Sequence, residues 1–263
     1  MGDYIKYLKN KKLLQDNLAY DPSTEHDACG VGLIATTNGK KSRRIVEYGI
    51  EALKAVWHRG AVDADGKSGD GAGMQLEIAP DFFKEKILST GHKHDSSKRI
   101  CVGMIFLPKN NYSDQERCRE IIETVLLQEN FSIYGWRQVP VNPKVLGKTA
   151  DQNRPEIAQV LFKKNVQLKT NDLERELFVT RKKIEKIARE RQLKEFYICS
   201  FSSRSIVYKG MFLAEALADF YPDLKDSKFT SRFTIFHQRY STNTFPSWDL
   251  AQPFRTLAHN GEI

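Results

Sequence analysis

Cys29 is the residue whose surroundings suggest nucleophilic chemistry, because small residues flank it in the run Asp27-Ala28-Cys29-Gly30. If the peptide bond before Cys29 is broken, the thiol and a free α-amine belong to one residue. An α-amine has an unperturbed pKa of about 7.7–8.0, so near neutral pH part of it can accept the thiol proton. This predicts an N-terminal nucleophile. Taken alone, a cysteine before a strand is more often a buried core residue, and that alternative remains open here.

Two polar segments near the end of the sequence have the residue types to bind and polarise a substrate. Arg239 and Thr242 lie in the run HQRYSTNT at 237–244, where a planar guanidinium suits a carboxylate and hydroxyls can orient an amino acid. Asn260 and Gly261 can supply a side-chain amide and a backbone N–H to an oxyanion hole. Each segment has a plainer interpretation, a polar turn and an Asn-Gly hairpin turn, respectively.

Two other motifs are interpreted as turns. The glycine-rich run SGDGAG at 68–73 could suggest a phosphate cradle, but residues 74–78 have the pattern of a strand rather than of the helix such a cradle needs. We therefore expect a tight turn there and no nucleotide. His92 and His94 lie in a loop rich in Gly, Ser and Lys with no third ligand nearby, which favours an exposed turn over a metal site.

The elements that must position these residues alternate between strand and helix. Apolar runs predict a buried strand at 31–36, further strands at 74–78, 100–107 and 230–238, and a hairpin made by 195–201 and 204–208. Helical spacing predicts helices at about 43–57 and 171–192, and a capping box of Ser113 and Glu116 predicts another helix beginning there. The pattern predicts an α+β domain but gives no sheet topology.

Composition and charge exclude several classes of protein. The chain has 263 residues, 40% hydrophobic and 28% charged, which is ordinary for a globular domain. It has no apolar run long enough to cross a bilayer, and its first twenty residues lack the continuous apolar core of a secretory signal. The formal net charge is +8, but the basic residues form short scattered runs without interleaved aromatics, which favours solvated surface over nucleic-acid binding.

The four cysteines, Cys29, Cys101, Cys118 and Cys199, are too dispersed for a zinc site and are expected to be thiols. Cys101 and Cys199 lie in strand-like runs and Cys118 lies on an apolar helix face. We expect these three to be small buried hydrophobic residues.

Four motifs considered together resemble one family. They are DACGVGLIA at 27–35, HRGAVDADGKSGDGAGM at 58–74, FHQRYSTNTFPSW at 236–248 and AQPFRTLAHNGEI at 251–263. They closely resemble the amidotransferase region of glutamate synthase large subunits, a group of class II glutamine amidotransferases. The resemblance extends from about residue 21 to 263 and includes intermediate stretches such as YGWRQVPV and FYICSFSSRSIVYKGM.

The resemblance implies a four-layer αββα N-terminal-nucleophile hydrolase sandwich, incomplete at its C-terminus. Residues 1–28 would be a propeptide or leader, and residues 29–263 the amidotransferase domain. The catalytic residues would be Cys29, Asn260 and Gly261, and the pocket for the glutamine would contain Arg59, Arg239 and Thr242. The aspartate that binds the α-amino group in this family would lie beyond residue 263.

The resemblance also implies partners. The substrate would be L-glutamine, and the ammonia would pass to 2-oxoglutarate in downstream synthase domains that carry FMN and an iron–sulfur cluster. A small subunit or ferredoxin would deliver electrons, in the cytoplasm. The abrupt end of the sequence after Asn-Gly also suggests a longer polypeptide. Two alternatives remain: a catalytically silent regulatory module, which would retain Met1, and a basic nucleic-acid-binding domain, whose affinity would fall steeply with salt.

Overall fold

Two antiparallel sheets form the centre of the computed structural model, which describes residues 2–17, 29–241 and 244–259. The first, here called the β2 sheet, contains in spatial order β1 (Gly30–Ala35), β8 (Phe233–Gln238), β2 (Ser68–Glu77) and β7 (Ser205–Phe212). The second, the β3 sheet, contains β4 (Phe131–Gln138), β5 (Glu156–Lys164), β3 (Cys101–Leu107) and β6 (Tyr197–Ser202).

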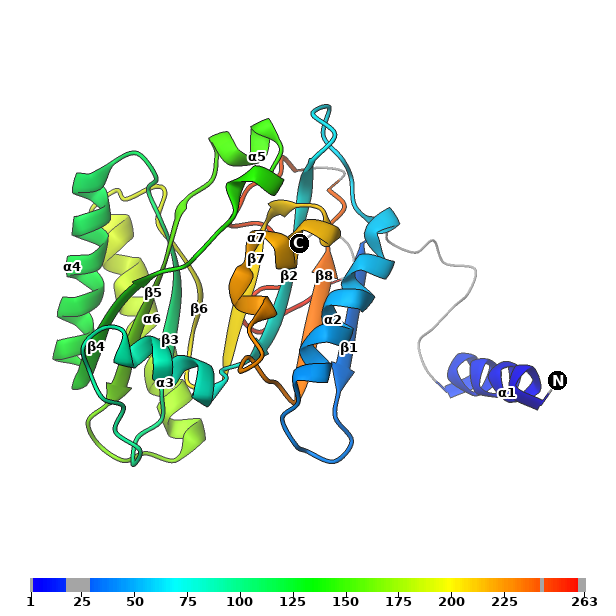
Figure 1. Ribbon diagram of the computed structural model, residues 1–263, viewed down its shortest axis with the longest axis horizontal. Helices are drawn as coiled ribbons and strands as arrows, with labels where there is room; N and C mark the ends of the chain where they lie inside the picture. Colours follow the sequence, from blue (N-terminus) through cyan, green and yellow to red (C-terminus); the bar gives the residue numbers. More distant parts are fainter. Residues whose placement is uncertain (1, 18–28, 242–243, 260–263) are drawn as a thin grey trace.

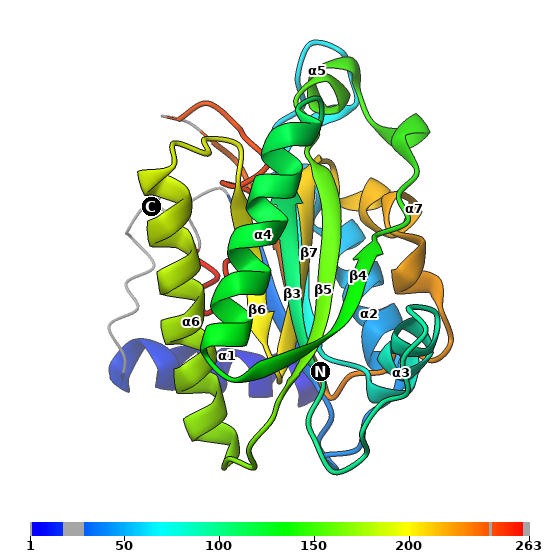
Figure 2. The same cartoon turned by 90° about the vertical axis from the view of Figure 1, so that its left-hand side faces the viewer.

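The longer helices of this region lie on the outer faces of the two sheets (Figures 1 and 2). Helix α2 (Arg43–Ala55) contacts β1 and β8, whereas α4 (Tyr112–Gln128) and α6 (Thr170–Glu190) lie side by side over the β3 sheet. Between these helices the two sheets face each other. The remaining helices are α1 (Gly2–Asn17), α3 (Pro80–Leu88), α5 (Lys148–Gln152), α7 (Leu217–Phe220) and the 3₁₀ turns η1 (Trp57–Arg59), η2 (Pro143–Val145), η3 (Ala214–Ala216) and η4 (Pro222–Lys225).

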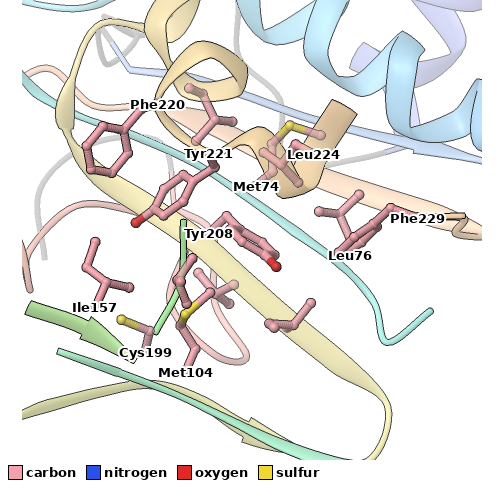
Figure 3. Close-up of a cluster of buried hydrophobic side chains, with 14 of the residues drawn as sticks. Met74, Leu76, Met104, Ile157, Cys199, Tyr208, Phe220, Tyr221, Leu224 and Phe229 are labelled. Atoms are coloured by element: carbon pink, nitrogen blue, oxygen red, sulfur yellow. The ribbon is translucent and has the colours of Figure 1, made fainter. Parts of the chain in front are cut away.

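Strand β3 is buried on both faces because it separates the inter-sheet core from the helices. Successive side chains of a strand point to opposite faces. Val102, Met104 and Phe106 accordingly belong to the inter-sheet core, and Cys101, Ile105 and Leu107 pack with α4 and α6. Figure 3 shows part of the inter-sheet core, where Met104 and Cys199 of the β3 sheet meet Tyr208 of the β2 sheet. A continuous apolar run such as 100–107 is what a strand buried in this way requires.

Helix α2 is fixed by its cap and by a close approach to the β2 sheet. The Ser42 side chain accepts a hydrogen bond from the Arg44 N–H and caps the N-terminus. A methyl group added at Gly49 would lie 2.4 Å from Thr234 Cγ2 of β8, so only glycine allows this packing distance. The helix therefore holds β8, the strand that leads into the predicted substrate-binding run, against its neighbours.

Several predicted elements are confirmed. Strand β3, helix α2 and helix α6 lie within two residues of their predicted bounds, and Cys101, Cys118 and Cys199 are buried as expected. The mixed α and β composition is also confirmed. Strands β4 and β5 were not predicted; β4 is interrupted by a register shift next to Gly135, whose φ of 149° breaks the simple alternation of side chains.

Three local predictions are wrong. Residues 195–208 do not form a hairpin, because β6 and β7 pair in different sheets and the chain crosses from one to the other between them. Helix α4 is capped by Asn111, whose side chain accepts from the Asp114 N–H, and not by Ser113 and Glu116. Strand β1 is not fully buried: it has one strand neighbour among the described residues, and Leu33 is 65% exposed.

Candidate active site

Strand register brings Cys29 and Arg239 together from opposite ends of the sequence. In the antiparallel pair β1–β8, Gly30 lies opposite Gln238 and Val31 lies opposite His237. One step further toward the same end of the sheet, Cys29 therefore faces Arg239. On the other side of β8, the Arg239 N–H donates to the Gly71 carbonyl at 2.7 Å. Three segments that are distant in sequence thus meet at one end of the β2 sheet.

The sulfur of Cys29 contacts the backbone that follows Arg239. Cys29 is 4% exposed. The Tyr240 N–H points to its Sγ atom at 3.4 Å, and the thiol is 3.6 Å from the Tyr240 carbonyl oxygen, to which it can donate. The backbone of Tyr240 therefore holds the sulfur in one position beside Arg239. A fixed sulfur position suits a nucleophile.

The segment after β8 is held in place by Asp70, which sequence reasoning missed. Asp70 lies in β2, is 8% exposed, and accepts a hydrogen bond from the Ser241 N–H at 2.5 Å. Arg239 is 5% exposed and donates from Nη2 to the Thr244 Oγ1 at 2.6 Å. The sequence signal for Asp70 was a charged residue within a glycine-rich run. If such a carboxylate is buried, it requires hydrogen-bond donors from other segments.

The base of the Arg59 side chain lies close to β1 and β8, because the next residue, Gly60, has no side chain to collide with Gln238. A Cβ atom at Gly60 would lie 2.2 Å from the Nε2 atom of Gln238, which is completely buried. A Cβ atom at Gly30 would lie 3.3 Å from Arg59 Cβ, so the base of the Arg59 side chain lies next to the residue that follows Cys29. That Arg59 lines the glutamine pocket stays a prediction.

The glycine-rich run at 68–73 is part of strand β2, so the predicted turn is wrong. The strand has a register shift between Ser68 and Ala72. Its glycines make room for another segment of the chain: a Cβ atom at Gly71 would lie 2.8 Å from Ala251 Cβ, and one at Gly73 would lie 2.6 Å from the Gln252 carbonyl oxygen. The run therefore accommodates the backbone that leads toward Asn260.

Other candidate residues have plainer roles or lie outside the described residues. Thr242, Asn260 and Gly261, as well as residues 18–28, belong to the latter group. Burial raises the thiol pKa of Cys101, Cys118 and Cys199, so these thiols stay protonated and unreactive at neutral pH.

In the described ranges, no group of three or more His, Cys, Asp or Glu residues could hold a metal ion. No described helix is both long and apolar enough to span a bilayer.

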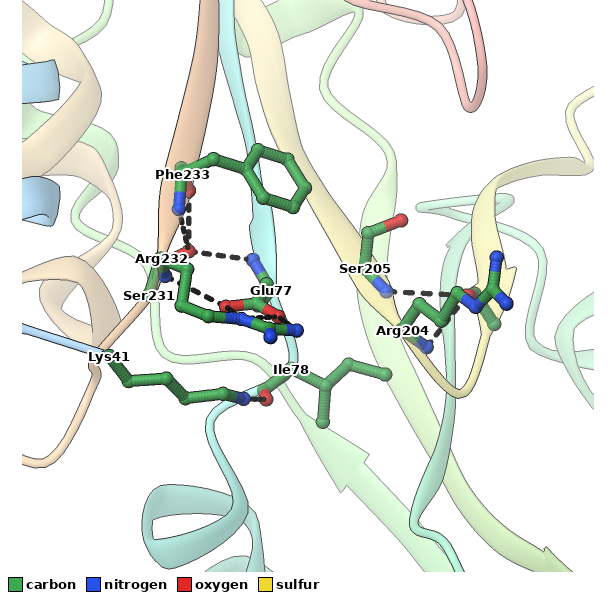
Figure 4. A network of polar contacts seen from close by, with 9 residues as sticks. Lys41, Glu77, Ile78, Arg204, Ser205, Ser231, Arg232 and Phe233 are labelled. Atoms are coloured by element: carbon green, nitrogen blue, oxygen red, sulfur yellow. Dashed lines mark hydrogen bonds and ion pairs between the residues drawn. The ribbon is translucent and has the colours of Figure 1, made fainter. Parts of the chain in front are cut away.

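A cavity of about 910 Å³ lies at the opposite end of the β2 sheet, among Lys41, Glu77, Arg204 and Arg232 (Figure 4). Arg232 binds the buried Glu77 carboxylate through Nε at 2.9 Å and Nη2 at 2.6 Å. These residues lie at the start of β8 and the end of β2, whereas Cys29 lies beside the end of β8. The cavity and Cys29 therefore lie at different ends of the β2 sheet.

Comparison with known proteins identifies the family. A sequence model described as "Glutamine amidotransferases class-II" matches residues 29–263. The chain belongs to this family. It is 56% identical over 245 residues to the "Glutamate synthase [NADPH] large chain" of Azospirillum brasilense, a match that covers 93% of this chain and 16% of the relative.

Two further relatives of this amidotransferase domain are named as ferredoxin-dependent enzymes. It is 47% identical over 242 residues to the "Ferredoxin-dependent glutamate synthase" of Pyropia yezoensis, covering 91% of this chain and 16% of the relative. It is 45% identical over 248 residues to "Ferredoxin-dependent glutamate synthase 1, chloroplastic/mitochondrial" of Arabidopsis thaliana, covering 92% and 15%. The chain thus spans about one sixth of the length of these relatives.

Proposed function

We propose that this chain is the glutaminase region of a glutamate synthase, and that Cys29 is the nucleophile that releases ammonia from L-glutamine. The observation that carries the proposal is the placement of the Cys29 sulfur against the Tyr240 backbone, beside Arg239. We assign the fold to the four-layer αββα N-terminal-nucleophile hydrolases. The two facing sheets and their outer helices support this assignment (Figure 1).

The first step is maturation, because the Cys29 nitrogen must become a free amine before it can accept a proton. We propose that residues 1–28 form a leader that is removed by cleavage of the peptide bond before Cys29. The family match begins at Cys29, which supports this boundary. The new α-amine then lies on the same residue as the thiol, and its ordinary pKa of about 7.7–8.0 lets it exchange protons at neutral pH.

The reaction then follows from the proton balance of the site. The Cys29 thiolate attacks the side-chain amide carbon of glutamine, and Asn260 with the Gly261 N–H stabilises the oxyanion. The carbon–nitrogen bond breaks as the α-ammonium returns its proton to the leaving ammonia, which leaves a γ-glutamyl thioester. Water, deprotonated by the amine, hydrolyses the thioester to glutamate and regenerates the thiol. Removing an oxyanion donor from such a site costs about 2.7–4 kcal/mol of activation free energy.

Substrate binding is assigned to the two arginines that lie near Cys29. The Arg239 guanidinium would hold the α-carboxylate of glutamine, with Thr242 beside it, because its planar fork matches a carboxylate. Arg59 would line the same pocket from η1. The aspartate expected to bind the α-amino group would lie beyond residue 263.

The names of the relatives extend the proposal to the whole polypeptide. Ammonia would pass to 2-oxoglutarate in synthase domains that hold FMN and an iron–sulfur cluster, with electrons from NADPH or ferredoxin, as those names indicate. We assign both groups to the synthase part. The four cysteines of this chain are all buried, and they are too dispersed to hold an iron–sulfur cluster. We also propose that the polypeptide can associate with a glutamate synthase small subunit and that it is cytoplasmic.

The test combines N-terminal sequencing with a glutaminase assay on the full polypeptide that contains this chain. Cys29→Ala is expected to abolish both cleavage before residue 29 and ammonia release. Cys118→Ala, which removes a buried thiol from α4, is the matched control and is expected to keep both. Active protein that still begins at Met1 would refute the maturation step. Ammonia release by the Cys29→Ala protein would refute the nucleophile.

A further inference from the structure

Residues 248–259, here called the 248–259 loop, run from Trp248 to the residue before Asn260 and contact both sheets. The Trp248 ring packs against Phe106 of β3 and Phe212 of β7. Gln75 of β2 donates to the Arg255 carbonyl at 2.8 Å. Loop backbone that is buried in this way must be satisfied by specific partners, so the loop has a defined position.

Lys209 of β7 holds the first half of the loop. Its Nζ atom donates to the carbonyl oxygens of Asp249 and Ala251, both at 2.7 Å, and lies over the rings of Tyr197 and Phe254. The residue is 1% exposed, so its ammonium group has exchanged water for these partners. The glycines of β2 leave room for the same backbone, as described above.

The last described residue of the loop, His259, is held at both of its backbone groups. The side chain of Gln252, which is 2% exposed, accepts the His259 N–H through Oε1 at 3.0 Å. The carbonyl oxygen of His259 lies 2.6 Å from Nε2 of His237, a completely buried residue of β8. The two peptide planes that flank His259 are thereby fixed by buried side chains.

The chemistry of His237 determines the direction of this contact. A carbonyl oxygen only accepts hydrogen bonds, so the Nε2 atom must carry a proton and donate it. Burial lowers the pKa of His237 to about 4, so the ring is neutral at physiological pH and exists as the Nε2–H tautomer. The bond therefore persists throughout the neutral range.

We propose that His237 is a positioning residue for the oxyanion hole: by holding the His259 carbonyl, it fixes the peptide that leads directly into Asn260. That carbonyl belongs to the peptide bond from which the chain continues to Asn260 and Gly261, so holding it fixes the point from which both proposed donors extend. The inference rests on the proposed function, because it assumes that Asn260 and Gly261 stabilise the transition state. His237 touches no reacting atom and acts only through the loop.

The expected kinetic signature separates this role from a general loss of structure. Transition-state donors act on the chemical step, so their misplacement lowers kcat and leaves the glutamine KM nearly unchanged. Removing a whole donor costs about 10²–10³-fold in kcat. Loss of the positioning bond is expected to cost less, about 10–100-fold, because the donors remain present in some conformations.

The experiment uses the full polypeptide and measures glutamine hydrolysis under steady-state conditions. His237→Leu removes the donor and is expected to lower kcat about 10–100-fold with KM within about twofold. His237→Gln places an amide N–H near the position of Nε2 and is expected to restore most of kcat. His94→Leu, at the cavity remote from Cys29, is the control and is expected to match the wild type. If His237→Leu does not fold by circular dichroism, His237→Asn, whose amide is too short to reach, replaces it.

A double-mutant cycle with Asn260→Ala decides whether His237 acts through Asn260. If it does, the combined variant is no slower than Asn260→Ala alone. Fully multiplicative losses, or a His237→Leu protein with normal kcat, overturn the inference and leave the proposed function intact. Normal kcat in Asn260→Ala instead overturns the proposed oxyanion role, and with it the inference that depends on it.

Discussion

Replacing Gly73 with alanine tests whether the β2 strand and the 248–259 loop must approach as closely as the structure shows. The added methyl group would lie 2.6 Å from the Gln252 carbonyl oxygen and 2.7 Å from Lys209 Cβ. Strands β7 and β8 flank β2 and are hydrogen-bonded to it, so the loop must move. Reaching an ordinary contact distance of about 3.4 Å requires a shift of about 0.8 Å at Gln252.

This shift is expected to lower the rate of glutamine hydrolysis, because the Gln252 side chain also accepts a hydrogen bond from the His259 N–H. Overpacking of this size typically destabilises a protein by about 1–3 kcal/mol. Displacing catalytic groups by about 1 Å can lower a rate about 100-fold. We therefore expect Gly73→Ala to reduce the glutaminase kcat about 10–100-fold, with a smaller effect on KM.

The matched control is Gly91→Ala, which strains the backbone but displaces nothing. Gly91 has a φ of 82° and no atom within 4 Å of an added Cβ. Its substitution is expected to cost about 1–2 kcal/mol in unfolding free energy without changing kcat. Urea unfolding and glutaminase kinetics on both variants provide the comparison. Equal kcat losses in the two proteins, or a normal kcat in Gly73→Ala, would refute the reasoning.

Three further predictions concern the substrate, the fold and the nucleophile. Arg239→Lys is expected to raise the glutamine KM about 10–100-fold while changing kcat less, because lysine lacks the bidentate fork; initial-rate kinetics measure both. Asp223→Ala leaves the Arg137 guanidinium buried without its carboxylate and should lower the free energy of unfolding in urea by about 3–5 kcal/mol. The control Asp114→Ala removes a carboxylate from an exposed helical pair and should lower it by less than about 1 kcal/mol. An electrophilic glutamine analogue is expected to label Cys29 alone in the mature protein, as peptide mass mapping would show, because burial raises the thiol pKa of the other cysteines. Comparable losses in both aspartate variants, an unchanged KM in Arg239→Lys, or labelling of a second cysteine would contradict the respective prediction.

Some features of the fold could be predicted because their signals are local. Helix α6 shows its apolar residues at helical spacing, and the continuous apolar run of β3 suits a strand between two layers. The crossing from β6 to β7 could not be predicted in this way. Two short apolar strands joined by Ser203 and Arg204 have the pattern of a hairpin whether they pair with each other or with strands of different sheets.

The residues of the candidate site also differ in whether local sequence patterns could reveal them. Residue types at short fixed spacings were enough to indicate the family, the candidate nucleophile Cys29 and the arginine of the HQRYST run. The contacts of the folded chain were needed to show that Asp70 holds Ser241, that the glycines of β2 make room for the 248–259 loop, and that His237 holds His259. The first two contacts join segments about 170 and about 180 residues apart, and all three depend on register or on the course of a buried loop. Register and loop course are set by packing of the whole domain and leave no periodic signal in either segment.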